Sequence, residues 1–335
     1  MSKITIALLN YNGKTHLENY LPSVVKHSIG HEIVVIDNGS TDGSLQFLEI
    51  NFPQVKTIAY AKNYGFCGGY NKALKSLNTE LVVLLNTDVQ VSAGWIEPIV
   101  ALMEADSGIA AVQPKLLDLK RQTHFEYAGA SGGHLDILGY PFCRGRIFHT
   151  VEKDELQYQN TQDVFWASGA ALFVRRSAYF EAGGLDEDFF AHMEEIDLCW
   201  RFWNLGYKVK VCPQSTVYHL GGGTLDKTSP RKTYLNFRNG LSILLKNEAT
   251  SDLLWKLPLR LALDWLAILQ FSVLSGLPHG IAIIRAHCDF MRSIPLQLNK
   301  RKEVIRLNKT NPRFRRLLIW DYFLSSKKTY NDLKI

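Results

Sequence analysis

The sequence predicts an α/β fold in which a parallel sheet carries helices on both faces, followed by a helical and basic C-terminal extension. Two observations lead to this prediction. Residues 1–120 alternate between short apolar runs typical of strands and longer segments typical of helices. Beyond residue 245 the pattern is helical, and basic residues accumulate toward the end of the chain. Alternating strands and helices form βαβ units, whose parallel strands are covered by helices on both sides.

Four apolar runs near the N-terminus have the length and the flanking turn residues of buried strands. We expect strands at residues 4–9, 32–36, 55–59 and 81–85, and helices at 15–27, 44–50 and 69–77. In a parallel sheet, ligands bind outside the carboxyl ends of the strands. The polar residues that follow these strands are therefore the first candidates for a functional site.

The pattern after residue 120 is less regular. Residues 120–165 are rich in glycine and aromatic side chains, and we expect long loops or short strands that form a flap facing an acceptor. Strand-like runs follow at 164–175, 207–211 and 217–219, then a mobile glycine-rich loop at 221–224 and a helix at 234–246. We therefore divide the chain into a body, 1–245, with halves 1–120 and 121–245, and a helical C-terminal region, 246–335.

Composition places the chain among ordinary globular proteins. Hydrophobic residues make up 46% of its 335 residues and charged residues 21%, which excludes an intrinsically disordered protein. The five cysteines are scattered without a Cys-x-x-Cys pair, which favours reduced thiols over a zinc knuckle or a disulfide framework. The apolar run at the N-terminus is too short for a signal peptide. We therefore expect a cytoplasmic protein.

The net charge of +6 is unevenly distributed. Residues 285–335 contain thirteen Lys and Arg against four Asp and Glu, a surplus of nine, which leaves a net −3 for the other 284 residues. A basic segment of this kind suits nucleic acid, anionic lipid or an acidic substrate. Few aromatic residues are interleaved with the basic ones, so we expect lipid or phosphoglycan headgroups and no nucleic acid.

An apolar run at 257–277 precedes this basic segment and is interrupted by Arg260 and Asp264. Its charge-free part, 265–277, is too short to span a bilayer. An apolar helix with a tryptophan at one end and basic residues after it suits a position in the membrane interface. A buried helix of a C-terminal bundle explains the pattern equally well, so both interpretations stay open.

Asp37 ends the second expected strand, and residues 38–44 turn from it into a helix. A carboxylate at a strand end can accept the imide N–H of uracil or thymine, or bind ribose hydroxyls. The plainer interpretation is an Asx turn with a helix N-cap. The first strand leads into Asn10-Tyr11-Asn12-Gly13 and not into G-x-G-x-x-G, which argues against a dinucleotide-binding site.

A glycine-rich segment, residues 63–71, follows the third strand and leads into a helix. Its first residues include Asn63 and Gly65. Glycines allow close backbone approach, and the N-terminus of a helix attracts phosphate. The alternative is a tight loop that serves only helix packing.

Asn86 and Asp88 follow the buried fourth strand and lie two residues apart. Their side chains offer oxygen ligands of the kind that Mg²⁺ or Mn²⁺ accepts while holding a diphosphate. A polar strand end that merely begins a turn is the alternative. His219 ends a later strand-like run and would add a nitrogen ligand, although a lone histidine is more often structural.

The densest charge cluster is acidic and contains Glu194, Glu195 and Asp197 among apolar and aromatic residues. A helix that begins near Met193 would place the three carboxylates in its first turn, where the macrodipole favours them. A carboxylate beside an apolar floor has a raised pKa, as a general base at neutral pH requires. A solvated, charge-capped helix start is the alternative.

The order of these segments resembles the family 2 glycosyltransferases, which have the GT-A fold, and especially their rhamnosyltransferase-like branch. The resemblance covers about residues 3–245 and is closest over 34–44 and 193–201. It implies a Rossmann-like mixed central sheet flanked by helices, with a nucleotide-sugar-binding half followed by an acceptor-binding and catalytic half. The C-terminal region is similar to the membrane-associating tails of such enzymes.

The resemblance also implies roles for the candidate residues. Asp37 would contact the nucleotide base, Glu195 would be the catalytic base, and Asp88 would hold Mg²⁺ or Mn²⁺ together with His219. The other implied positions are Asn10, Asn63, Gly65 and Asn86 on the donor side, and Trp166, Gly169, Glu194 and Asp197 on the acceptor side. Asn86 replaces the first aspartate of the family's Asp-x-Asp pattern, and Glu195 replaces an aspartate as the base.

These roles imply an inverting glycosyltransferase that moves a sugar from a UDP- or dTDP-linked donor to a hydroxyl of a glycan or lipid-linked saccharide. The reaction would serve cell-surface polysaccharide assembly, with peripheral contact to an anionic membrane. A sugar nucleotidyltransferase is one alternative, but it needs a glycine-rich triphosphate loop where only Gly13 and Lys14 are found. A non-catalytic sugar-nucleotide or glycan-binding subunit is another, and it would be expected to lose carboxylates that this chain retains.

Overall fold

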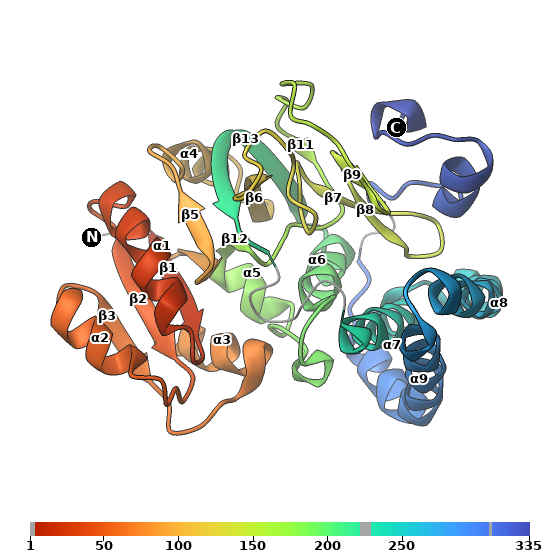
Figure 1. The fold of residues 1–335 in the computed structure, drawn as a ribbon, viewed down its shortest axis with the longest axis horizontal. Coiled ribbons are helices and arrows are strands. Elements are labelled where there is room, and N and C mark those ends of the chain that lie inside the picture. The colour runs from red at the N-terminus through yellow and green to blue at the C-terminus, as the bar shows by residue number, and fades with distance from the viewer. Residues whose placement is uncertain (1–3, 222–228, 308–309) are drawn as a thin grey trace.

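The computed structural model describes residues 4–221, 229–307 and 310–335. The expected mobile loop at 221–224 lies outside the described residues except for Gly221. Figure 1 shows the N-terminal strands and helices on one side of the molecule and a cluster of C-terminal helices on the other. The C-terminal segment, drawn in blue, lies beside the short strands of the middle region.

Within the described residues the central sheet has nine strands and is mixed, as the resemblance implied. The strands are β1 (Ile4–Asn10), β2 (Glu32–Asp37), β3 (Lys56–Ala59), β4 (Leu81–Asn86), β5 (Val89–Val91), β6 (Ile109–Asp118), β11 (Gln162–Asp163), β12 (Ala171–Arg175) and β13 (Lys208–His219). Their order is β11-β13-β6-β12-β4-β1-β2-β3, with β5 paired to β13. Strands β1 to β4 are parallel, whereas β12 runs antiparallel between β4 and β6.

A smaller antiparallel sheet forms from the irregular middle region, so the prediction of short strands between 120 and 165 is confirmed. Its strands are β7 (Gly133–Leu135), β8 (Pro141–Cys143), β9 (Arg146–Ile147) and β10 (Thr150–Val151). The sheet is connected to the body by Trp166, whose indole N–H donates to the carbonyl of His134 at 3.0 Å. A Cβ on Gly133 would lie only 2.1 Å from that indole ring, so this contact requires glycine.

Helices cover both faces of the central sheet, as predicted. The helices are α1 (Lys14–His27), α2 (Ser44–Asn51), α3 (Gly65–Ser76), α4 (Glu97–Ala105), α5 (Arg176–Glu181), α6 (Glu194–Leu205), α7 (Pro230–Asn247), α8 (Thr250–Leu274) and α9 (Leu277–Glu303), with short turns η1 (Glu187–Phe189), η2 (Trp320–Leu324) and η3 (Asn331–Leu333). One apolar core contains side chains of α1, α2 and α4, and the other contains side chains of α3, α5 and α6. Successive residues of β2 and β4 point alternately into the two cores.

Several element boundaries differ from the predictions, and three of these differences have a clear cause. Helix α3 begins at Gly65, four residues earlier than expected, because the Asn63 side chain accepts a hydrogen bond from the Gly65 N–H at 2.7 Å. Strand β12 begins only at Ala171, because residues 165 and 166 pair instead with Gly133. The two strand-like runs near 207–219 form one strand, β13, with an irregularity between Cys212 and Thr216.

The C-terminal helices pack on one another and on α6. Leu241 and Leu245 of α7 share a small apolar core with Phe290 of α9. Helix α7 crosses the proposed domain boundary at residue 245, and that boundary stays a prediction. The charge-free run alone is too short for a membrane span, but α8 as a whole, with 25 residues, is long and apolar enough by length and composition to cross a membrane.

Candidate active site

Three of the predicted donor-side residues meet at one edge of the central sheet. Strand β1 lies between β2 and β4, and its register pairs Asn10 with Asp37 and Leu9 with Asn86. Because these strands are parallel, their carboxyl ends lie at the same edge. The sequence prediction that strand-end residues come together is therefore confirmed for Asn10, Asp37 and Asn86.

Asp37 is fully buried, and its carboxylate is occupied by protein groups. Its Oδ2 accepts from Asn10 Nδ2 at 3.0 Å, and its Oδ1 accepts from the Ser40 N–H at 2.9 Å. This is the Asx-turn arrangement named as the alternative. Asp37 holds the 38–44 turn in place in this structure, and its contact with a nucleotide base stays a prediction.

Asn63 and Gly65 belong to a loop that is fixed by a second asparagine, Asn38. The Asn38 amide donates to Asn63 Oδ1 and to the Gly65 carbonyl, both at 2.9 Å, and its Oδ1 accepts from the Tyr64 N–H at 3.0 Å. Gly39, with φ +83°, packs so closely on this loop that a Cβ would lie 2.8 Å from the Lys62 carbonyl carbon. Asn63 therefore organises the loop, and Asn38 is a site-shaping residue that sequence reasoning missed.

Asp88 and His219 lie together, as predicted. Strand β5 pairs with β13 so that Val89 faces His219, which brings the preceding Asp88 to the imidazole. The distance from His219 Nε2 to Asp88 Oδ1 is 3.2 Å. On its other side, His219 Nδ1 lies 3.5 Å from Oε1 of Glu126, a buried carboxylate that sequence reasoning missed. The imidazole is therefore held between two carboxylates.

This cluster perturbs the pKa values of its members. Burial would lower the pKa of His219, but the nearby charge of Glu126, together with the hydrogen bond and charge of Asp88, raises it to about 10. Burial would raise the pKa of Asp88, but its hydrogen bond to His219 and the imidazolium charge outweigh this effect and lower it. The imidazole therefore carries a proton at neutral pH, beside the Asp88 carboxylate.

The cluster fits a divalent metal, although no three His, Cys, Asp or Glu side chains form a metal-binding group within residues 4–221, 229–307 and 310–335. Asp88 Oδ1 and His219 Nε2 face each other and supply the oxygen and nitrogen donors that Mn²⁺ accepts. His219 Nδ1 is buried without a hydrogen-bond partner and faces Glu126. A carboxylate in that position orients a metal-binding histidine and fixes its tautomer.

Helix α6 begins where the acidic cluster predicted it, and Met193 is its N-cap in the left-handed conformation. Glu194 is buried and Glu195 is half-buried, and the Oε2 atom of each is buried without a hydrogen-bond partner. Burial raises the pKa of Glu195 to about 7, although N–H groups at the helix start oppose it. Burial, and then the neighbouring Glu195, also raise the pKa of Glu194 well above its ordinary value. The alternative of a solvated, charge-capped start does not hold, because Glu194 is buried, Glu195 is half-buried and one oxygen of each is shielded from water.

The segment containing Gly169 connects the two parts of the site. A Cβ on Gly169 would lie 3.9 Å from the Cβ of Glu195. The next residue, Ala170, accepts a hydrogen bond from the Asn86 N–H at 3.0 Å. Gly169 therefore lies against Glu195, and its neighbour Ala170 lies against the end of β4. Trp166 is buried against the small sheet and serves packing in this structure.

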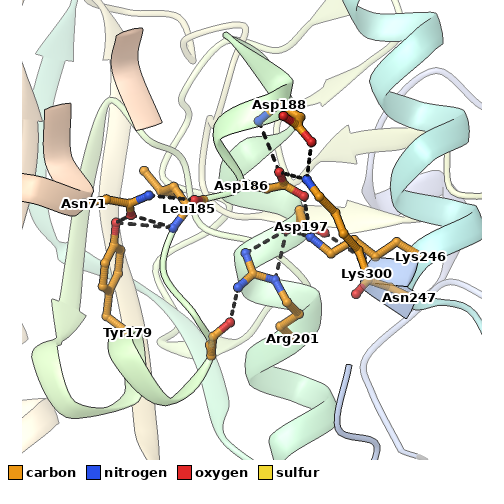
Figure 2. A network of polar contacts seen from close by, with 11 residues as sticks. Asn71, Tyr179, Leu185, Asp186, Asp188, Asp197, Arg201, Lys246, Asn247 and Lys300 are labelled. Carbon is orange, nitrogen blue, oxygen red and sulfur yellow. Dashed lines mark hydrogen bonds and ion pairs between the residues drawn. The ribbon is translucent and has the colours of Figure 1, made fainter. Parts of the chain in front are cut away.

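Asp197 is enclosed by protein donors in this structure, and its supporting role on the acceptor side stays a prediction. It is fully buried, and both of its oxygens accept from protein donors. Figure 2 shows Arg201, Lys246 and Asn247 around it, at 2.7 Å, 2.9 Å and 2.7 Å. Burial would raise the pKa of Asp197, but Arg201 and Lys246 lower it. The carboxylate therefore attaches α6 to α7.

A sheet edge of this kind, with strand-end polar residues and a carboxylate–imidazole pair, suits the pyrophosphate and sugar of a nucleotide sugar, and a carboxylate with a raised pKa lies nearby. The fold and the site together define the class of glycosyltransferases. Residues 5–176, just over half of the chain, match the family model described as glycosyl transferase family 2. The chain belongs to this family, which argues against the nucleotidyltransferase and non-catalytic interpretations.

Characterised relatives agree with the family. The chain is 29% identical over 241 residues to an N-acetylglucosaminyl-diphospho-decaprenol L-rhamnosyltransferase of Mycobacterium tuberculosis, covering 64% of this chain and 75% of the relative. It is 24% identical over 249 residues to the low-salt glycan biosynthesis hexosyltransferase Agl10 of Haloferax volcanii, covering 71% of this chain and 74% of the relative. The chain is therefore an enzyme of the hexosyl- and rhamnosyltransferase type.

Solved structures of low sequence identity share the fold. The structure of S. aureus TarS 1-349 in complex with UDP superposes with a TM-score of 0.57 at 17% identity, covering 90% of this chain and 88% of that one. The structure of GalNAc-T7 with UDP, GalNAc and Mn²⁺ superposes with a TM-score of 0.56 at 17% identity. The match covers 73% of this chain but only 48% of the GalNAc-T7 chain. The fold is therefore GT-A.

Proposed function

We propose that the protein is an inverting glycosyltransferase that moves a sugar from a UDP- or dTDP-linked donor to a hydroxyl of a glycan or lipid-linked saccharide. The observation that carries this proposal is the position of Glu195. Its carboxyl group has a pKa of about 7, and the residue lies against Gly169, whose neighbour Ala170 is hydrogen-bonded to Asn86 at the strand edge. A base with such a pKa is half ionised at neutral pH.

Inversion requires one direct displacement at the anomeric carbon. Glu195 takes the proton of the acceptor hydroxyl. The oxygen of that hydroxyl forms the new glycosidic bond to the anomeric carbon, while the bond from this carbon to the nucleotide diphosphate breaks on the opposite face of the sugar. Asp88 and His219 would hold Mg²⁺ or Mn²⁺, which when bound neutralises the charge of the leaving diphosphate. Asn10, Asp37, Asn63, Gly65 and Asn86 form the donor side, with Asp37 contacting the base. Glu194, Gly169 and Trp166 support the acceptor side.

The relatives support the substrate classes. The mycobacterial relative is named for a saccharide linked through diphosphate to decaprenol, TarS is described with UDP, and GalNAc-T7 with UDP and Mn²⁺. We propose a lipid-linked saccharide acceptor, a role in cell-surface polysaccharide assembly and a location at the cytoplasmic face of a membrane. The basic C-terminal region suits the anionic lipid of that face.

The surface of α8 supports peripheral membrane contact. Trp265, Leu266 and Leu269 are 61%, 64% and 67% exposed, and the exposed residues of this helix are apolar along its length after Asp252. Its remaining charged side chains face inward, where Lys256 pairs with Glu248 and Asp252. Arg260 likewise pairs with Asp264 at 3.0 Å. In a helix exposed to water, charged side chains face the solvent and apolar side chains face the protein. Helix α8 has the opposite arrangement, which suits a helix lying in the membrane interface.

The test is release of nucleotide diphosphate and glycoside formation from UDP-, dTDP- and GDP-sugars with synthetic lipid-linked acceptors, with and without Mn²⁺ or Mg²⁺. We expect turnover with one donor, a product of inverted anomeric configuration by NMR, and a loss of about 10²–10⁴-fold in Glu195→Gln. Retained configuration, or full turnover by a folded Glu195→Gln enzyme, would contradict the proposal.

A further inference from the structure

The segment that leads into helix α6 has an unusual backbone conformation. Between η1 and α6, the non-glycine residues Phe190, His192 and Met193 have positive φ angles of 62°, 67° and 75°. L-residues other than glycine, asparagine and aspartate rarely adopt this region, because Cβ approaches the backbone. Such a conformation persists only where surrounding contacts impose it, and it is concentrated at functional sites.

One side chain of α7 makes most of these contacts. Asn239 is fully buried, and its amide nitrogen lies 3.1 Å from the carbonyl oxygen of Phe189, 3.0 Å from that of Ala191 and 2.7 Å from that of His192. Its Oδ1 accepts from Arg238 Nε at 2.9 Å, which fixes the orientation of the amide. Arg238 Nη2 also donates to the carbonyls of Asp188 and Phe189, at 3.1 and 3.2 Å, but the carbonyls of Ala191 and His192 are held by the Asn239 amide.

Helix α7 also contacts α6 directly, through residues near its C-terminal end. Lys246 and Asn247 lie seven and eight residues after Asn239, two turns away on the same face of α7. Both donate to Asp197, and Lys246 also donates to Asp186, which precedes η1, at 2.7 Å (Figure 2). Helix α7 therefore fixes the segment before α6 and the first turn of α6 at separate points. In the sequence, Glu195 lies between the 189–193 segment, which Asn239 holds, and Asp197, which Lys246 and Asn247 hold.

We infer that Asn239 is a positioning residue for catalysis: its amide holds the strained 189–193 segment so that α6 presents the Glu195 carboxylate beside Gly169. This inference rests on the proposed role of Glu195 as the base. Without the amide, the segment relaxes toward ordinary backbone angles, and the start of α6 shifts with it. A misplacement of about 1 Å of a reacting group can reduce turnover by about 10²-fold.

The test compares Asn239→Leu, which has nearly the same shape but no amide, with Asn239→Ser, which keeps one donor. The matched control is Asn236→Leu on the same helix; in the described part of the structure no side-chain hydrogen bond involves Asn236. We expect kcat to fall about 10–100-fold in Asn239→Leu and less in Asn239→Ser, with the donor KM changed less than about threefold. The control variant should keep wild-type kcat.

Amide hydrogen exchange gives a second readout that does not depend on turnover. In Asn239→Leu, or in Asn239→Ser if the first variant does not fold, faster exchange should be confined to residues 189–197. Unchanged exchange there, or a rise spread evenly over the protein, would overturn the inference, as would unchanged kcat. Failure of the proposed function is distinguished by Glu195→Gln: if that enzyme keeps full turnover, the base is wrong, while the exchange result still decides whether Asn239 holds the segment.

Discussion

The Nε2 atom of His219 lies 3.2 Å from Oδ1 of Asp88, although the two residues are 131 positions apart in the sequence. This pair leads to the first prediction. Asp88→Ala and His219→Ala should each weaken Mn²⁺ binding at least tenfold, measured by calorimetric titration in the presence of UDP, because each removes a donor atom. Asp332→Asn, at the surface near the C-terminus, should bind Mn²⁺ as the wild type does. Equal affinity in all three variants would place the metal elsewhere.

Glu126 supplies the second prediction. Because its carboxylate faces His219 Nδ1 at 3.5 Å, Glu126→Ala should lower Mn²⁺ affinity about 10–100-fold, the usual effect of removing a carboxylate that orients a metal-binding histidine. Glu126→Gln keeps an oxygen acceptor and should lose less. The same titration measures both variants. Wild-type affinity in Glu126→Ala would show that His219 needs no such partner.

The raised pKa of Glu195 gives a pH prediction. The base acts only when ionised, so kcat/KM should fall as the pH decreases through about 7, and Glu195→Gln should lack this acid limb. The stability of the fold should depend on pH in the opposite direction to kcat/KM, decreasing as the pH rises. Because the folded-state pKa lies above the unfolded value, the carboxyl destabilises the fold increasingly as the pH rises from about 4.5 to 7.

The corresponding experiment measures thermal unfolding of wild type and Glu195→Gln at two pH values. The variant should unfold at a higher temperature than wild type at pH 8 and gain less at pH 5.5, where the native carboxyl is mostly protonated. A variant less stable than wild type at pH 8 would show that the Glu195 charge is solvated after all.

Lys246 carries the fourth prediction, because it neutralises two buried carboxylates, Asp186 and Asp197. Burial would raise the pKa of Asp186, but Lys246 and Lys300 lower it to about 2. This stabilisation is therefore present above about pH 4 and is lost as the pH falls toward 2. In urea denaturation at pH 7, Lys246→Met should lower the free energy of unfolding by about 3–5 kcal/mol.

The exposed ion pair between Lys208 and Asp106 provides the control for that measurement. Lys208→Met should change the unfolding free energy little, since water screens that pair. Adding Asp197→Asn to Lys246→Met should recover part of the loss, because it removes one of the uncompensated charges. A loss in Lys246→Met no larger than in Lys208→Met would mean that the buried network contributes nothing net.

The apolar surface of α8 carries the fifth prediction. Leu266→Glu combined with Leu269→Glu should reduce binding to vesicles containing anionic lipid at least tenfold in a flotation assay, while circular dichroism stays unchanged because both side chains are exposed. Leu156→Glu, at a residue 70% exposed in a distant loop, is the matched control and should bind normally. Vesicle binding that survives the double change would favour a protein partner for α8.

Much of the N-terminal half could be predicted because its signals are local. The apolar runs that form β1, β2 and β4, and the polar residues at their ends, follow from strand periodicity and from the rule that parallel strands end at one edge. The carboxylate helix was predicted in the same way, from Glu194 and Glu195 beside apolar neighbours. Glu126 could not be found, because it lies in an irregular segment without periodicity, and only long-range pairing brings it to His219.

The sequence by itself determined the α/β architecture, the strand edge that carries Asn10, Asp37 and Asn86, and the acidic start of α6, because these depend on periodicity and on neighbours close in the chain. Tertiary structure alone decided which buried carboxylates have a basic partner. Asp197 forms an ion pair with Lys246 of α7, whereas one oxygen of Glu195 has no hydrogen-bond partner and the pKa of this group is raised. It also decided that Lys256, Arg260 and Asp264 of α8 face inward. Both outcomes depend on burial and long-range pairing, since the pKa and the accessibility of a side chain are set by the groups that the fold packs against it.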